Sequence, residues 1–186
     1  GFDPWAYPTG GAIGFYTAAW LLGLVESSSS NVVALIMAGT AAAVTVSTYA
    51  AIRLAAARPV GRVVAALGAL AIGLSPFVVS KMGHYNVAAV YLLPTVIAAI
   101  GYLRIRRSRR ATLAVLGVVA VVALVSPLWW TFVALYFLGL GLVVSLFTRS
   151  RRWTGTVAAM FGAVLAGGAI PMLLSVTHHV AGGTLN

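Results

Sequence analysis

The sequence predicts an all-α integral membrane protein with about six transmembrane helices and one further helix at the membrane interface. Hydrophobic residues make up 61% of the 186 positions, charged residues only 8%, and the mean hydropathy is +1.03. Such a composition is far from that of soluble globular domains. Helices are expected because apolar segments of about 20 residues recur, and a helix of that length spans the hydrocarbon core with its backbone groups satisfied. Residues 1–186 are therefore predicted to form a single transmembrane domain.

The first predicted element is an outer loop, residues 1–30, that contains an interfacial or re-entrant helix over residues 11–25. This stretch, GAIGFYTAAWLLGLV, is too short to cross a bilayer comfortably and carries aromatic residues suited to the interface. The chain does not begin with Met. We expect it to be part of a longer protein.

Apolar segments long enough to be transmembrane helices follow this loop. They are residues 31–54, 62–80, 87–103, 111–125, 128–147 and 154–176. Residues 177–186 are predicted to form an outer tail.

The fourth and fifth segments are predicted to form a tight hairpin at Ser126-Pro127-Leu128. Proline lacks the backbone N–H and breaks a helix. The alternative is one long kinked helix, but an apolar stretch of that length would overshoot the bilayer.

Small residues at four-residue spacing would allow close helix contacts in two segments, and ordinary packing of small side chains is the alternative. The second span has Ala65, Ala69 and Gly73, and the last span has Ala163 and Gly167.

Positive charges predict the orientation in the membrane, because short cytoplasmic loops carry the excess of Lys and Arg. All the arginines fall in or beside the loops that join spans one and two, three and four, and five and six; Lys81 is the only cation elsewhere. We therefore expect a multi-pass plasma-membrane protein whose arginine-rich loops are cytoplasmic. The N-terminal segment is then extracytoplasmic.

The composition also argues against several classes of function. The net charge of +10 is spread over short runs between apolar segments and does not predict nucleic-acid binding. There are no cysteines, no P-loop, no GxSxG elbow and no HExxH motif. With two acidic residues in the chain, neither a two-metal site nor a paired-carboxylate hydrolase is predicted, and no metal-binding residues are assigned.

The opening stretch GFDPWAYP places one of the two acidic residues, Asp3, among aromatic side chains. Asp3 is the candidate catalytic carboxylate. Trp5 and Tyr7 are candidate substrate-binding residues, since their rings are suited to stacking on a sugar. The alternative is an Asp-Pro turn in which the carboxylate accepts hydrogen bonds from local backbone amides.

A second outer loop, SKMGHYN, supplies Lys81, His84 and Asn86 as further candidate substrate-binding residues. Lys81 and His84 can stabilise a phosphate oxygen as a leaving group departs, and Asn86 can bind a hydroxyl. The alternative is a solvated turn in which the Lys81 side chain reaches the lipid headgroups.

These motifs resemble those of bacterial, actinobacterial-type polytopic membrane glycosyltransferases of the GT-C superfamily. The matching elements are Gly1-Phe2-Asp3-Pro4-Trp5-Ala6-Tyr7-Pro8 before a re-entrant helix, Ser75-Pro76-Phe77, Gly83-His84, and Leu92-Leu93-Pro94. The resemblance covers roughly residues 1–104. It implies a GT-C-like fold in which this chain begins inside the first outer loop, after a first helix. The family's principal catalytic Asp usually lies nearer the end of that helix, so a substrate-binding role for Asp3 is an alternative.

The resemblance further implies transfer of a sugar from a polyprenyl-phosphate donor to an acceptor hydroxyl at the extracytoplasmic face, in the cell envelope. The expected partners are membrane lipid and a lipid-linked sugar, and use of a divalent cation is left open. Two alternatives from other classes stand beside it: a lipid or sugar-lipid transporter, and a non-catalytic membrane subunit.

Overall fold

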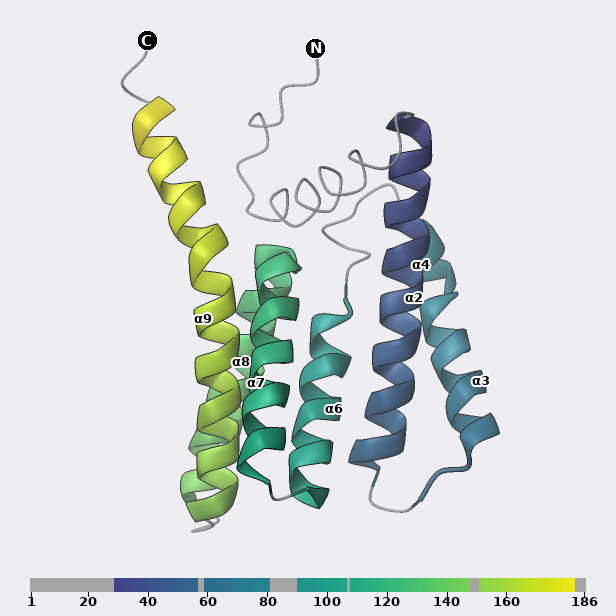
Figure 1. Ribbon diagram of the computed structural model, residues 1–186, viewed down its shortest axis with the longest axis vertical. Helices are drawn as coiled ribbons and strands as arrows, with labels where there is room; N and C mark the ends of the chain where they lie inside the picture. Colours follow the sequence, from purple (N-terminus) through teal and green to yellow (C-terminus); the bar gives the residue numbers. More distant parts are fainter. Residues whose placement is uncertain (1–28, 57–58, 81–89, 107, 148–150, 183–186) are drawn as a thin grey trace.

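The computed structural model describes residues 29–56, 59–80, 90–106, 108–147 and 151–182, and these contain helices and no strand. The helices are α2 (Ser29–Ala55), α3 (Arg62–Gly73), α4 (Pro76–Ser80), α6 (Leu92–Ile105), α7 (Arg109–Val125), α8 (Leu128–Phe147) and α9 (Arg151–Gly182) (Figure 1). The predicted all-α class is confirmed for this part of the chain. The predicted interfacial helix, residues 11–25, lies outside the described residues.

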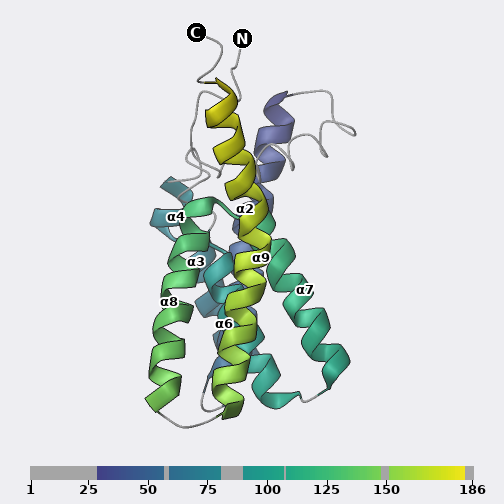
Figure 2. The same ribbon diagram turned by 90° about the vertical axis from the view of Figure 1, so that its left-hand side faces the viewer.

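The helices run alternately up and down, so that their connections gather at two opposite ends of the bundle (Figures 1 and 2). One end holds the connections after α2, α6 and α8, and we call it the arginine end. The other holds the Ser126-Pro127 connection between α7 and α8, and we call it the hairpin end. All the described arginines lie at the arginine end, as the sequence predicts: Arg53, Arg62, Arg104, Arg106, Arg109, Arg110, Arg151 and Arg152.

Several of the helices are suited to a membrane by length and composition. Four stretches in the described part of the chain are long and apolar enough to cross it: Ala34–Ala55, Arg62–Val79, Trp129–Phe147 and Arg151–Ile170. The second of these runs over both α3 and α4. Leu92–Ile105 is apolar but shorter. The protein therefore has the character of a multi-pass membrane protein. The predicted break at Pro127 is confirmed, since α7 ends at Val125 and α8 begins at Leu128. The hairpin is open and not tight, because the two helices diverge from this connection and each packs on α9 (Figure 2).

The structure corrects the predicted bounds of three spans, which are the second, the third and the last. The second span is not one continuous helix, because α3 ends at Gly73 and α4 starts at Pro76. The Oγ of Ser75 accepts a hydrogen bond from the N–H of Val78 at 3.3 Å, which is N-cap geometry with proline at the first helical position. The third helix begins at Leu92, although residues 87–91 were expected to be part of it; residues 81–89 lie outside the described residues.

The last helix is also longer than predicted. α9 runs from Arg151 to Gly182, so residues 177–182 are helical and do not belong to a tail. At about 1.5 Å per residue it is roughly 48 Å long, which exceeds the hydrocarbon core of about 30 Å. Figure 1 shows α9 extending well beyond α6 and α7 at the hairpin end, nearly level with the start of α2.

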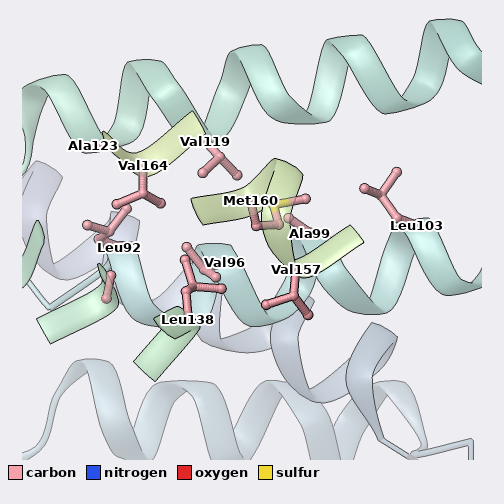
Figure 3. Close-up of a cluster of buried hydrophobic side chains, with 11 residues drawn as sticks. Leu92, Val96, Ala99, Leu103, Val119, Ala123, Leu138, Val157, Met160 and Val164 are labelled. Atoms are coloured by element: carbon pink, nitrogen blue, oxygen red, sulfur yellow. The ribbon is translucent and has the colours of Figure 1, made fainter. Parts of the chain in front are cut away.

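The core of the bundle is built around α6, which contacts α2, α7, α8 and α9. Its buried residues form one apolar cluster with residues of α7, α8 and α9 (Figure 3). The cluster consists of Leu92, Val96, Ala99, Leu103, Val119, Ala123, Ala134, Leu138, Val157, Met160 and Val164. α6 is therefore buried although it is shorter than the membrane is thick.

Small residues allow the helices to approach closely, as predicted. Ala65, Ala69 and Gly73 are the buried residues of α3, which packs on α2. In α9, a Cβ placed on Gly167 would overlap the carbonyl oxygen of Ala120 in α7. Without these small side chains the backbones would have to move apart.

We predict that Gly167→Ala destabilises the bundle by about 1–3 kcal/mol, because the new methyl group overlaps the α7 backbone. Gly162→Ala is the matched control in the same helix, since a Cβ at Gly162 meets no atom within 4 Å. It should be neutral or stabilise by up to about 1 kcal/mol through helix propensity. The measurement is the free energy of unfolding in mixed micelles. Equal stability of the two variants would contradict the close approach of α7 and α9.

Candidate functional site

The residues that the sequence singles out lie outside the described part of the chain. Asp3, Trp5 and Tyr7 precede Ser29, and Lys81, His84 and Asn86 fall within residues 81–89. The roles assigned to these side chains therefore stay predictions. The structure does describe the part of the bundle to which both segments connect.

Both segments connect to the hairpin end. α2 starts at Ser29, where the N-terminal segment joins it, and the second loop lies between Ser80 and Val90 (Figure 1). These attachment points lie opposite the arginine end. Residues about 80 positions apart in the sequence are thus joined to the same end of one bundle.

Several backbone groups at the α7–α8 connection have hydrogen-bond partners nearby in the chain. Ser126 takes an extended conformation (φ −79°, ψ 147°), as expected for a residue before proline. Its Oγ donates to the carbonyl of Val122 at 2.6 Å, and its N–H donates to the carbonyl of Ala123 at 3.3 Å. The carbonyl of Pro127 accepts the first hydrogen bonds of α8, from the N–H groups of Trp130 and Thr131.

Tyr91 ties this hairpin to the start of α6. Its hydroxyl donates to the carbonyl of Val125, the last residue of α7, at 3.0 Å. The side chain is buried and packs with Val44 of α2 and Val78 of α4. The carbonyl of Tyr91 accepts hydrogen bonds from the N–H and the Oγ1 of Thr95. Tyr91 thereby fixes the point at which the second loop enters the bundle.

Two hydrogen-bond donors are buried near the hairpin, at the start of α8. The Oγ1 of Thr131 and the Nε1 of Trp130 have no hydrogen-bond partner among the protein atoms. Thr131 is 2% exposed and lies where α8 meets Gly168 of α9, at which a Cβ would overlap the Thr131 side chain. The neighbouring Trp129 is 67% exposed, and exposed Trp side chains are frequent where a transmembrane helix meets the membrane interface.

The hydroxyl groups described near the α7–α8 connection can donate and accept hydrogen bonds, and the indole of Trp130 can donate one. In the region that the structure describes, no three His, Cys, Asp or Glu side chains gather. Both side-chain carboxylates of the sequence, Asp3 and Glu26, precede α2. Among these 186 residues, the side-chain carboxylates that could act as acid or base therefore lie in the segment before α2.

Sequence reasoning did not identify Tyr91 and Thr131 as parts of this end. Each is a single hydroxyl-bearing residue within a predicted apolar span, and no spacing along the chain links Tyr91 to Val125. Their burial follows from the packing of α6 and α8, which a linear pattern does not show.

Comparison of the chain with models of protein families, with curated proteins and with solved structures gives no match. The resemblance to GT-C glycosyltransferases therefore rests on the short motifs.

We predict that Tyr91→Phe destabilises the bundle by about 1 kcal/mol, because it removes a hydrogen bond to a carbonyl at a helix end. Tyr136→Phe is the matched control, since Tyr136 is 64% exposed. Thermal unfolding in detergent should separate the two variants. A Tyr91→Phe protein as stable as the Tyr136→Phe protein would contradict the structural role of this hydroxyl.

Proposed function

We propose that the protein is an inverting glycosyltransferase that moves a sugar from a polyprenyl-phosphate donor to an acceptor hydroxyl at the extracytoplasmic face of the plasma membrane. The observation that carries the proposal is the separation of the bundle into two ends. The arginines lie at one end, and the segments with Asp3 and with Lys81, His84 and Asn86 connect to the other. The proposal also draws on the motif resemblance.

The proposed reaction needs a base for the acceptor and stabilisation of a phosphate leaving group. The acceptor oxygen attacks C1 of the sugar while Asp3 takes the hydroxyl proton. The bond between C1 and the phosphate oxygen breaks, and the polyprenyl phosphate leaves with its charge stabilised by Lys81 and His84. Trp5 and Tyr7 offer rings on which the sugar can stack, and Asn86 can bind a sugar hydroxyl. Attack from the face opposite the leaving group inverts the configuration at C1.

The proposed orientation places the arginine end in the cytoplasm. The chain has no cysteine, so a single cysteine can be introduced to test this orientation without first replacing native cysteines. Asn31 and Ser108 suit the test because both are exposed and lie at opposite ends of the bundle.

We predict that a membrane-impermeant maleimide added to intact cells labels Asn31→Cys and not Ser108→Cys. After permeabilisation both variants should react. The reverse pattern in intact cells would overturn the orientation, and with it the outer location of the reaction.

The test of the activity is sugar transfer by the purified full-length protein with a panel of polyprenyl-phosphate donors. Because Asp3 is proposed to accept the proton, we predict that Asp3→Asn lowers turnover by about 100-fold or more at unchanged donor affinity. Glu26→Gln is the matched control, since Glu26 is the other carboxylate of the chain and is followed by a serine run. It should retain activity.

The other outcomes separate the rival functions. Full activity in Asp3→Asn would show that Asp3 is not the catalytic base and would favour the Asp-Pro turn as its role. Movement of the lipid-linked sugar across vesicles without an acceptor would favour a transporter. No transfer with any donor, together with co-purification of an active partner, would favour a non-catalytic subunit.

A further inference from the structure

The arginine end contains a basic pocket between three helices. One part, of about 160 Å³, is lined by Arg104 and Arg152 together with Ile100, Leu103, Trp153 and Thr156. The adjoining part, of about 480 Å³, is lined by Arg106 and Arg152 together with Leu103, Thr112, Gly155, Thr156 and Ala159. Leu103, Arg152 and Thr156 line both parts. We call the whole the arginine pocket.

The three walls of the pocket come from helices that pack against one another. α6 supplies Arg104, in its last turn, and Arg106 caps its C-terminal end. α9 supplies Arg152 in its first turn, and α7 supplies Thr112. Contacts of α6 with α7, of α6 with α9, and of α7 with α9 hold the walls together (Figures 1 and 2).

No side-chain carboxylate of the surrounding helices can neutralise these arginines. The chain has no Asp or Glu after Glu26, so α6, α7 and α9 contain none. α7 and α9 also begin at this end, at Arg109 and Arg151, and their N-terminal dipoles add positive potential. The hydroxyls of Thr112 and Thr156 donate to the carbonyls of Ser108 and Arg152. The charged donors that face a ligand are therefore the guanidinium groups.

The pocket lies where an apolar helix bundle ends. Phe147, at the end of α8, is 83% exposed, and Trp153 is 38% exposed on the pocket rim. Exposed Phe and Trp beside arginines are typical of the boundary between the acyl chains and the headgroups of a bilayer. In a bilayer, that boundary lies at the depth of the lipid phosphates.

We propose that the arginine pocket binds the headgroup of an anionic phospholipid, with a preference for one that carries two phosphates. Each part of the pocket has an arginine of its own and shares Arg152 with the other. Two phosphates therefore fit the charge distribution better than one, and guanidinium groups bind phosphate oxygens in a bidentate manner. Basic pockets between transmembrane helices are known to hold such headgroups. The site depends only on the bundle lying in a membrane and not on the proposed transfer reaction.

The test is lipid binding by the purified full-length protein in detergent, followed by native mass spectrometry during titration with cardiolipin, phosphatidylglycerol or phosphatidylcholine. Cardiolipin, with two phosphates, should bind tightest, then phosphatidylglycerol, and phosphatidylcholine weakest.

Arg104→Gln and Arg106→Gln should each weaken cardiolipin binding about fivefold, and Arg152→Gln on the order of 20-fold. Arg62→Gln is the matched control, because it removes an equal charge at the same end from α3, which packs on α2. It should change binding less than about twofold.

A second pair of variants tests the shape of the pocket without changing its charge. A Cβ at Gly155 or at Gly162 of α9 meets no atom within 4 Å, but only Gly155 lines the pocket. Gly155→Leu should therefore weaken cardiolipin binding, and Gly162→Leu should leave it unchanged. The site is overturned if Arg62→Gln weakens binding as much as Arg152→Gln, since the attraction is then a diffuse property of the arginine end. It is also overturned if inorganic pyrophosphate displaces cardiolipin at equal concentration, since the pocket is then selective for a soluble anion.

Discussion

Much of this structure depends on one constraint, that lipid offers no hydrogen-bond partner to a polypeptide backbone. Helices meet the constraint along their length, and their ends need other donors. At the α7–α8 hairpin these donors are Ser126 and Tyr91, which satisfy carbonyls at the end of α7. Several hydroxyls within the helices are satisfied by donation to the carbonyl one turn earlier, as in Thr40, Thr45 and Ser47 of α2. Polar side chains are thus tolerated in an apolar bundle because the backbone itself supplies their partners.

A second consequence is that the helices associate by close packing, because burial from lipid brings little hydrophobic gain. Gly73, Gly101 and Gly167 each lie against an atom of a neighbouring helix that a Cβ would overlap. Close packing contributes most to holding α6 in place, because α6 is short and is surrounded by α2, α7, α8 and α9. The large apolar side chains on the outside of the bundle, among them Leu67 and Phe137, are then suited to contact with acyl chains.

The two ends of the bundle differ in chemistry. The arginine end has positive charge without a neighbouring carboxylate, which is suited to holding anionic headgroups. The hairpin end has buried hydroxyl and indole donors, among them Thr131 and Trp130, and the loops with the candidate catalytic residues connect to it. The proposed lipid site and the proposed transfer site would therefore lie at opposite membrane surfaces. A lipid bound at the arginine end would act on stability and orientation and would not take part in the chemistry.

The sequence by itself determined the helical class, the alternation of the helices, the gathering of the arginines at one end and the break at Pro127, because each follows from local composition and backbone chemistry. It also identified Ala65, Ala69 and Gly73 as a contact surface, since small residues at one-turn spacing have few other uses in a membrane. Only the tertiary structure decided that α6 is the central helix and that Tyr91 reaches Val125. It also brought Arg104, Arg106 and Arg152 around one pocket. The physical reason is that such contacts join helices far apart in the chain, and their geometry is set by packing rather than by any pattern within one segment.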